Sequence, residues 1–309
     1  MQARYLRVSV TDRCNLRCSY CTPMKTRTGA PKQDLLTYEE VASVVRVAAS
    51  LGVSKVRLTG GEPLRRPGIE FLIREIAQIP DIQDRGLTTN GVRLRDFVPV
   101  LARARFRVNV HLDTLIPERY REVMGGPGPE SAIEGVLAAV DAGIAVKLNA
   151  VCTAETTRAD VESVLEFAKD LRVPVRFIEA MPVSGVPLDQ GAQTAIRALE
   201  AALWRRWSLI PQPGDGVARM YRGLDSGVQV GFVTPSSAHF CDGCTRLRLS
   251  ARGIVRTCLY ARDGIDLRPF LRARDLSGLR EALLRSFAIK HERAGREGTE
   301  ILTMMGIGG

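Results

Sequence analysis

Short β-rich runs alternate with helical patterns through the first half of the chain, and this alternation limits the possible folds more than any other feature. The runs expected to form strands lie at 5–10, 55–59, 86–89, 107–112, 146–151 and 175–178. The helical patterns lie between them, at 37–51, 69–79, 94–103, 130–142 and 158–171. Strands that are joined through helices in this way run parallel in one sheet.

The predicted strands are too apolar to face water, so we expect helices on the outside of the sheet. Two α/β arrangements fit, a partial (βα)6 barrel of the TIM type and an open doubly wound sheet, and we favour the barrel. In both arrangements the active face lies at the carboxyl ends of the strands.

A stretch rich in proline and glycine at 182–191 predicts a linker. We therefore expect a first domain at 1–185 and a C-terminal region of α+β type at 186–309. The elements predicted for this region are a helix at 194–207, antiparallel strands at 227–233, 246–251 and 253–259, and a helix at 276–291.

A run of three cysteines follows the first predicted strand. Cys14, Cys18 and Cys21 have the spacing C-x3-C-x2-C, which is too tight for ordinary disulfides and predicts a metal site. Three thiolates can hold three irons of a cubane iron–sulfur cluster, whereas a structural zinc needs a fourth ligand. The remaining iron would be open, so a small molecule could bind there and receive an electron.

A second set of three cysteines, Cys241, Cys244 and Cys258, lies in the C-terminal region. A zinc knuckle completed by His239 and an iron–sulfur cluster fit this spacing equally well. The seventh cysteine, Cys152, lies in an apolar run and is expected to be a buried core thiol.

The charge balance predicts anionic partners. Lys and Arg number 44 against 34 Asp and Glu, which gives a net charge of +10. Aromatic residues make up only 6% and are scattered, so no platform for stacking nucleic-acid bases is predicted. We do not expect a nucleic-acid partner, and a zinc-containing nucleic-acid-binding protein is the alternative from another class.

The sequence also predicts a cytoplasmic protein without a membrane partner. No apolar run is long enough to span a bilayer, and the N-terminus does not resemble a signal peptide. Seven cysteines in such a chain are more typical of metal sites than of disulfides.

Several motifs together resemble a known family. The C-x3-C-x2-C run with Tyr20 before its third cysteine, and Gly60-Gly61-Glu62-Pro63 at a predicted strand end, resemble the radical S-adenosylmethionine (SAM) superfamily. The second set, C-x2-C-x13-C with Thr-Arg-Leu-Arg after its second cysteine, and the terminal Gly308-Gly309 are similar to the GTP 3′,8-cyclase family of molybdenum cofactor biosynthesis. A radical SAM enzyme that modifies peptides is the second enzymatic interpretation, but such enzymes typically carry more auxiliary cysteines.

The resemblance implies a [4Fe–4S] cluster at each cysteine set, the second one in the C-terminal extension. It implies that SAM binds the open iron of the first cluster and that the guanine of GTP binds that of the second. A 5′-deoxyadenosyl radical would remove a hydrogen from the ribose C3′, and the product would be 3′,8-cyclo-GTP. The implied partners are an electron donor and, downstream, the cyclic pyranopterin monophosphate synthase; we expect a monomer or homodimer.

The resemblance also implies which residues bind each ligand. Those for SAM are Tyr20, Gly61, Glu62, His111 and Met181, of which His111 stands where the family usually has a serine. Those for GTP are Arg7, Arg57, Thr88, Lys147, Arg176, Arg246, Leu247 and Arg248. The tail residues Gly308 and Gly309 would enter the active site.

Three of the cations for GTP are also noteworthy from the sequence itself. Arg7, Arg57 and Lys147 lie in otherwise apolar predicted strands. A charge buried there is costly unless a ligand or partner neutralises it. This favours an anionic ligand inside the predicted barrel.

Overall fold

The structure is a computed structural model, and it describes residues 4–21, 31–182, 189, 191–214, 217–224, 226–235 and 244–292. Within these residues no helix is both long and apolar enough to cross a membrane. The predicted domain boundary at residue 185 lies outside the described residues and stays a prediction.

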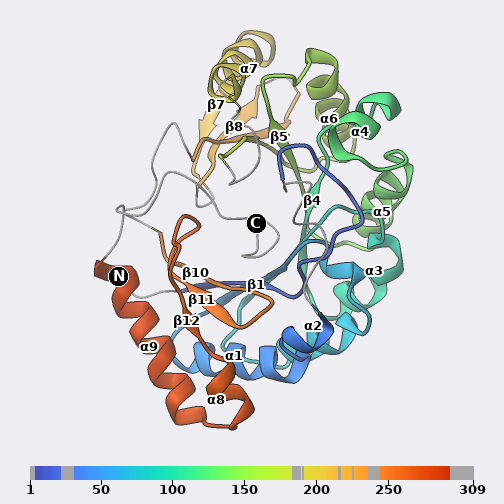
Figure 1. Cartoon of the computed structure of the whole chain (residues 1–309). Coiled ribbons are helices and arrows are strands. Elements are labelled where there is room, and N and C mark those ends of the chain that lie inside the picture. The colour runs from blue at the N-terminus through green and yellow to red at the C-terminus, as the bar shows by residue number, and fades with distance from the viewer. Residues whose placement is uncertain are drawn as a thin grey trace.

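Six parallel strands form the centre of the sheet, in the order in which they occur along the chain. They are β1 (Tyr5–Ser9), β2 (Lys55–Thr59), β3 (Asp84–Thr89), β4 (Arg107–His111), β5 (Val146–Cys152) and β6 (Val175–Glu179). A doubly wound sheet reverses its strand order at a switch point, and this sheet does not. The partial (βα)6 barrel is therefore confirmed, and Figure 1 shows the sheet curving inside a ring of helices.

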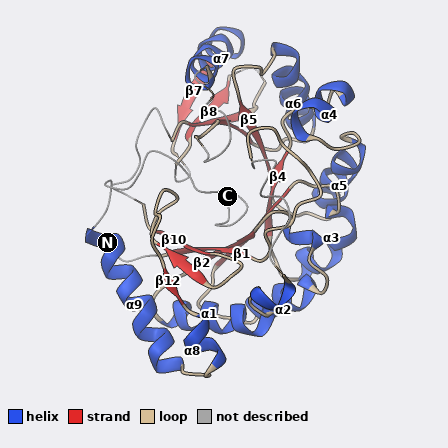
Figure 2. Ribbon diagram, in the orientation of Figure 1, coloured by secondary structure: helices blue, strands red, loops and turns tan. Residues whose placement is uncertain are grey.

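The outer helices cover the convex side of the sheet (Figure 2). The predicted ones are α1 (Tyr38–Ser50), α2 (Ile69–Ala77), α3 (Leu94–Arg103), α5 (Glu130–Asp141) and α6 (Arg158–Asp170). Thr37 begins α1 through a capping box, because its side chain accepts a hydrogen bond from the Glu40 N–H and Glu40 bonds back to the Thr37 N–H. Short 3-10 turns lie at Lys32–Asp34 and Pro63–Arg65.

Two helices were not predicted: the short α8 (Arg268–Arg272), and α4 (Pro117–Met124) in the barrel, which lies between β4 and α5. Helix α4 is the one that bears on the site. Its sequence Pro-Glu-Arg-Tyr-Arg-Glu-Val-Met has no wide apolar stripe, and only Tyr120 and Met124 are buried. The pattern that reveals the other helices is therefore weak here.

The C-terminal strands extend both edges of the barrel sheet. The elements after the barrel are α7 (Ala192–Trp207), β7 (Leu209–Gln212), β8 (Arg219–Gly223), β9 (Gln229–Val233), β10 (Arg246–Leu249), β11 (Ile254–Arg256), β12 (Ile265–Asp266), α8 (Arg268–Arg272) and α9 (Leu276–Glu292). The prediction of antiparallel strands is wrong in part, because β9 runs parallel to β6 and β10 runs parallel to β1. Each is antiparallel only to its other neighbour, β8 or β11. The parallel pairings satisfy the backbone groups along the open edges of the barrel.

Side chains alternate between the two faces of the barrel sheet. On β1 and β2, the outward residues Leu6, Val8, Val56 and Leu58 are fully buried in the core under the helices. The inward residues of the same strands are polar or charged, beginning with Tyr5, Arg7 and Arg57. The inside of the barrel, called here the chamber, is therefore lined by polar side chains on these strands rather than by a second apolar core.

Candidate active site

The loop with the first three cysteines packs directly against the Gly-Gly turn that follows β2. The Gly61 N–H donates to the Thr11 carbonyl at 2.7 Å, and the Glu62 N–H donates to the Arg13 carbonyl at 2.8 Å. A Cβ on Gly61 would lie 2.4 Å from the Arg13 oxygen, and one on Gly60 would lie 2.5 Å from the Thr11 oxygen. Only glycine permits this close approach of the two loops.

The unpredicted helix α4 supports the other side of the same loop. The Arg17 and Ser19 N–H groups donate to the carbonyls of Met124 and Val123 at 2.9 and 3.0 Å. Leu16 packs with Tyr120 and Met124 in a small apolar cluster that Cys14 and Cys18 border. The cysteine loop is thus held between the end of β2 and the end of α4.

The cysteines themselves are half-buried and close enough to influence one another. Burial raises the pKa of Cys14 to about 11, with the Glu62 and Cys21 charges adding to it and the Leu16 N–H opposing it. Burial, and then the charge of Cys21, raise the pKa of Cys18 well above its ordinary value. The thiols of Cys14 and Cys18 are therefore neutral near pH 7 until a bound metal draws off their protons.

In the described ranges, no three His, Cys, Asp or Glu side chains converge to hold a single metal ion. A cubane cluster does not need such convergence, because each thiolate binds a different iron. Three thiols on one supported loop fit a [4Fe–4S] cluster better than a single zinc ion, for which a fourth ligand is needed.

Glu62 joins the ends of β2 and β3. Its carboxylate is 1% exposed and accepts hydrogen bonds from the Leu64 N–H at 2.9 Å, the Thr89 hydroxyl at 2.8 Å and the Asn90 N–H at 2.8 Å. Burial raises its pKa to about 7, although these hydrogen bonds oppose the shift. The side-chain amide of Asn90 points to the Cys14 sulfur at 3.8 Å, which connects Glu62 with the cysteine loop.

Tyr20, His111 and Asp113 form a partly buried polar network beside the cysteine loop. The Tyr20 hydroxyl contacts both Nε2 of His111 and a carboxylate oxygen of Asp113. The other oxygen of Asp113 accepts from the Val151 N–H at 2.7 Å and lies 3.3 Å from His111 Nε2. Because the tyrosine donates its single proton to Asp113, Nε2 of His111 carries the proton that the tyrosine oxygen accepts.

Burial is the largest influence on the pKa of His111 and lowers it, but the charge and hydrogen bond of Asp113 outweigh burial and leave it raised. The sequence drew attention to Tyr20 and His111 and missed Asp113. The signal was present, because Asp113 follows the end of β4, where polar residues of a barrel gather.

Four arginines gather around Tyr5 on the inner face of β10, β1 and β2. Arg7 lies opposite Arg57 on one side and Arg248 on the other, and Arg246 lies opposite Tyr5. Arg57 and Arg248 are only 6% and 8% exposed. These inner-face residues, Tyr5, Arg7, Arg57, Arg246 and Arg248, are named here the arginine cluster.

Arg57 shows how the cluster is built. Its Nε donates to the Tyr5 hydroxyl at 3.1 Å, and Nη1 donates to the Leu87 carbonyl at 3.4 Å. A Cβ on Gly86 would lie 2.7 Å from its Cζ, so the glycine in β3 provides the room for the guanidinium.

The charges of the arginine cluster affect one another. Burial, and then the charges of Arg7 and Arg246, lower the pKa of Arg248 to about 9. Burial raises the pKa of Tyr5, but the charges of Arg7, Arg57 and Arg246 outweigh it and lower the value to about 8. Such a concentration of positive charge favours a polyanionic ligand.

The remaining barrel residues predicted for GTP lie on the same inner face. Thr88 is in register with Asn109, which is in register with Lys147, and Arg176 is in register with Asn149. Asn149 was missed by the sequence reasoning, which had no motif for it. It is 9% exposed, and its Oδ1 finds no hydrogen-bond partner among the described residues; the same holds for the Thr88 hydroxyl.

Two predicted ligand-binding residues do not present a side chain on this inner face of the strands. The side chain of Leu247 is 1% exposed and lies on the opposite face, in the apolar core. Only its backbone is thus available to the chamber. Met181 follows the end of β6 and is half-buried.

The second cysteine set is described in part. Cys244 and Cys258 are half-buried, whereas Cys241, His239, Gly308 and Gly309 lie outside the described residues. The Lys290 ammonium donates to the Cys244 sulfur at 3.5 Å and to the Thr257 carbonyl at 2.7 Å. Burial raises the pKa of Cys244, but the charge of Lys290 and the contacts from Arg246 outweigh it and lower the value overall.

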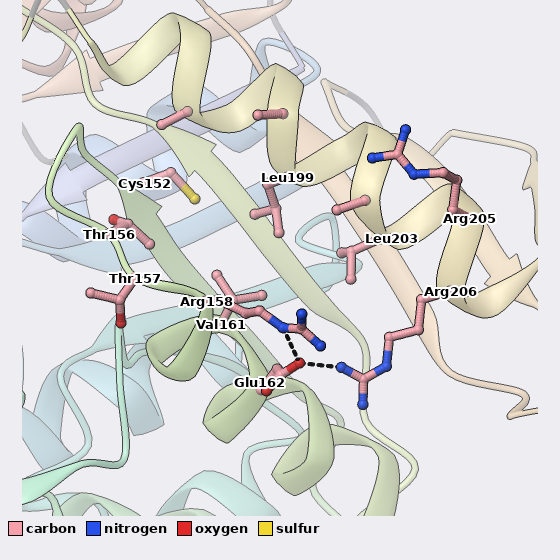
Figure 3. Close-up of a pocket in the computed structure, with 13 residues that line it drawn as sticks. Cys152, Thr156, Thr157, Arg158, Val161, Glu162, Leu199, Leu203, Arg205 and Arg206 are labelled. Carbon is pink, nitrogen blue, oxygen red and sulfur yellow. Dashed lines mark hydrogen bonds and ion pairs between the residues drawn. The ribbon is translucent and has the colours of Figure 1, made fainter.

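A groove of about 600 Å³ lies outside the barrel, between α6 and α7. Figure 3 shows Val161 facing Leu199 and Leu203 across it, and Arg158 and Arg206 bound to Glu162 at its rim. Cys152 lines it and is 1% exposed, which confirms the buried thiol. None of the predicted site residues lines this groove, so it is separate from the chamber.

Comparisons with known proteins match two families to successive stretches of the chain. Residues 8–168 match the model of the radical SAM superfamily, and residues 173–295 match that of the Molybdenum Cofactor Synthesis C family. The GTP 3′,8-cyclase of Pelotomaculum thermopropionicum is 42% identical over 94% of this chain and 92% of its own. Molybdenum cofactor biosynthesis protein 1 of Bos taurus is 35% identical over 87% of this chain and 43% of its own.

A solved structure shows the same fold at lower identity. Streptococcus suis SuiB bound to S-adenosylmethionine aligns with a TM-score of 0.66 at 16% identity, over 89% of this chain and 65% of its own.

Proposed function

We propose, given that this chain belongs to the GTP 3′,8-cyclase family of the radical SAM superfamily, that it converts GTP to 3′,8-cyclo-GTP inside its barrel, as the first step of molybdenum cofactor biosynthesis. The observation that carries the proposal is the position of the arginine cluster: it lies on the inner face of the same sheet whose first strand leads into the three-cysteine loop. The loop proposed to carry the radical source and the residues proposed to bind a polyanion thus belong to one sheet.

The first cysteine set is proposed to hold the [4Fe–4S] cluster of the superfamily through Cys14, Cys18 and Cys21. When bound, this cluster and SAM would supply a 5′-deoxyadenosyl radical to take a hydrogen atom from the ribose C3′, so that C3′ could bond to C8 of the guanine. The radical left on the ring would then need one electron from an external donor and one proton to give the product. The contribution of the chain is to hold the loop between the Gly-Gly turn and α4. A loop fixed in this way keeps its ligands preorganised.

The groups proposed to bind SAM surround that loop. The buried Glu62 carboxylate suits an ammonium group, whose positive charge would favour the ionised form of a carboxyl with a pKa of about 7. Tyr20 and His111 present a hydrogen-bonded pair at the other side, fixed by Asp113. Gly61 and the half-buried Met181 are proposed to complete the SAM site.

The arginine cluster is proposed to bind the triphosphate of GTP. Guanidinium groups offer paired N–H donors that match phosphate oxygens, and Arg246 and Arg248 present theirs from alternate positions of β10. Lys147 and Arg176 extend the positive lining to β5 and β6. The inward Thr88 hydroxyl and the Asn149 amide oxygen provide buried polar atoms for the nucleoside.

The second cysteine set is proposed to hold a second [4Fe–4S] cluster, through Cys241, Cys244 and Cys258. Its place next to Arg246 would bring the guanine and the triphosphate of one nucleotide to neighbouring positions. The tail with Gly308 and Gly309 is proposed to enter the same chamber. We further expect an external electron donor, the cyclic pyranopterin monophosphate synthase downstream, and a monomer or homodimer.

The test is anaerobic incubation of the reconstituted protein with SAM, a reductant and GTP, followed by mass analysis. We expect 5′-deoxyadenosine and an isomer of GTP. The Cys14→Ala variant is expected to form neither, whereas Cys244→Ala is expected to cleave some SAM without converting GTP. The proposal fails if the intact protein cleaves SAM and leaves GTP unchanged under conditions in which both cysteine sets carry iron.

A further inference from the structure

The C-terminal helix α9 brings a lysine to the second cysteine set. Leu279, Leu283 and Phe287 form a buried stripe on this helix, which packs against α1 and β11. Lys290 follows Phe287 by three positions and continues the same stripe. A lysine at the end of an apolar stripe must find partners for its ammonium group, because leaving it unpaired there is costly.

The partners of Lys290 are a cysteine of the second set and the backbone next to another cysteine of that set. Its ammonium lies 3.5 Å from the Cys244 sulfur and 2.7 Å from the carbonyl of Thr257, the residue that precedes Cys258. One side chain thus connects two cysteine segments whose cysteines are separated by thirteen residues in the sequence. The ammonium has three donors, so it can keep both contacts when the sulfur is a thiolate.

We infer that Lys290 is a positioning residue of the second cluster: its ammonium contacts the Cys244 sulfur and the backbone next to Cys258, and so fixes the two ligands relative to each other. This inference rests on the second cluster of the proposed function. A positive charge and an N–H···S hydrogen bond at a cluster ligand favour the reduced, more negative cluster, so they raise its reduction potential.

The experiment isolates the second cluster in a protein that lacks the first cysteine set, with Cys14→Ala, Cys18→Ala and Cys21→Ala combined. In that protein we compare Lys290→Met, which removes the charge at similar length, with Lys290→Arg, which keeps it. The control is Arg285→Met, which removes a charge from an exposed position on the same helix. Iron loss to a chelator and the midpoint potential by electron paramagnetic resonance are measured anaerobically, and thermal unfolding checks that each variant is folded.

We expect Lys290→Met to lose iron about tenfold faster than the parent, as is usual when a partner of a metal ligand is removed. Its midpoint potential should also be lower, Lys290→Arg should lie between, and Arg285→Met should match the parent. If Lys290→Met and Arg285→Met retain iron equally and have equal potentials, the role of Lys290 is overturned while the second cluster stands. If the parent itself binds no iron, the second cluster is overturned, and the role of Lys290 with it.

Discussion

The N–H of Gly61 donates to the carbonyl of Thr11 at 2.7 Å, and this bond joins the turn after β2 to the loop that carries the first cysteine set. The two backbones are so close that a methyl group on Gly61 would lie 2.4 Å from the Arg13 oxygen. The glycine is therefore a condition for the shape of the cysteine loop, in addition to any contact with SAM.

Replacement of Gly61 by alanine is expected to move the cysteine loop and to prevent assembly of the first cluster. Overpacking of this kind costs about 1–3 kcal/mol. Bound iron and the absorption of the cluster measure the effect after anaerobic reconstitution. Gly143→Ala is the control, since a Cβ there meets no atom within 4 Å and the cost is confined to its left-handed backbone conformation. Normal cluster content in Gly61→Ala would show that the loop tolerates displacement.

Replacement of Gly86 by alanine is expected to push the Arg57 guanidinium out of the arginine cluster. A Cβ there would lie 2.7 Å from Arg57 Cζ. Loss of one charge-assisted hydrogen bond should weaken GTP binding roughly tenfold, with SAM binding unchanged. Equilibrium dialysis measures the dissociation constants of GTP and of SAM. Gly278→Ala is the matched control, because its Cβ would meet Phe270 at 2.5 Å on the outer helices; equal GTP affinities in the two variants would rule out a specific effect on Arg57.

GTP binding is expected to weaken as the pH rises through about 8. The pKa of Tyr5 is lowered to about 8, so above that value the free protein holds a phenolate that neutralises part of the arginine cluster. Bound phosphates disfavour the phenolate, so binding must take up a proton, and affinity should fall by up to about tenfold per pH unit. Dissociation constants from pH 7 to 9.5 measure this fall. In Tyr5→Phe the GTP affinity should depend less on pH. Ionisation of GTP itself affects the unchanged protein and the variant equally. Parallel pH profiles of the two would therefore exclude Tyr5 as the titrating group.

Asp113→Ala is expected to be more damaging than His111→Ser. Asp113 binds Tyr20, His111 and the Val151 N–H, so its removal leaves a buried donor unpaired at a cost of about 1–3 kcal/mol. His111→Ser leaves the bond between Tyr20 and Asp113 intact. Thermal unfolding and SAM affinity distinguish the two variants. The reverse order of damage would identify His111 as the group that positions Tyr20.

The barrel was predictable because its pattern is regular. Each barrel strand and helix predicted from the sequence is present, and Leu94–Arg103 has the predicted bounds. Periodic apolar residues and caps such as Thr37 with Glu40 are local signals, and they report the local backbone directly. Helix α4 was missed because it buries only two side chains, so its sequence lacks the periodic apolar pattern of the other barrel helices.

The pairing of the later strands was harder to predict from the sequence. Nothing in the sequence Arg246–Leu249 shows that its neighbour is β1, more than 200 residues earlier, because such pairing depends on distant packing. The same holds for Asn149 and Lys290, whose importance lies in what surrounds them in space. Family motifs identified the arginines but not the tyrosine at their centre or the glycine that makes room for one of them.

The pairing of β1 with β10 also has a consequence for biosynthesis. The strand that is made first lacks one neighbour until residues 246–249 have been synthesised, so the nascent chain must carry an incomplete barrel edge through most of translation. Such distant pairing slows folding. Ribosome-bound chains that stop before residue 246 should therefore resist proteolysis poorly, and protection should rise once β10 has emerged from the exit tunnel.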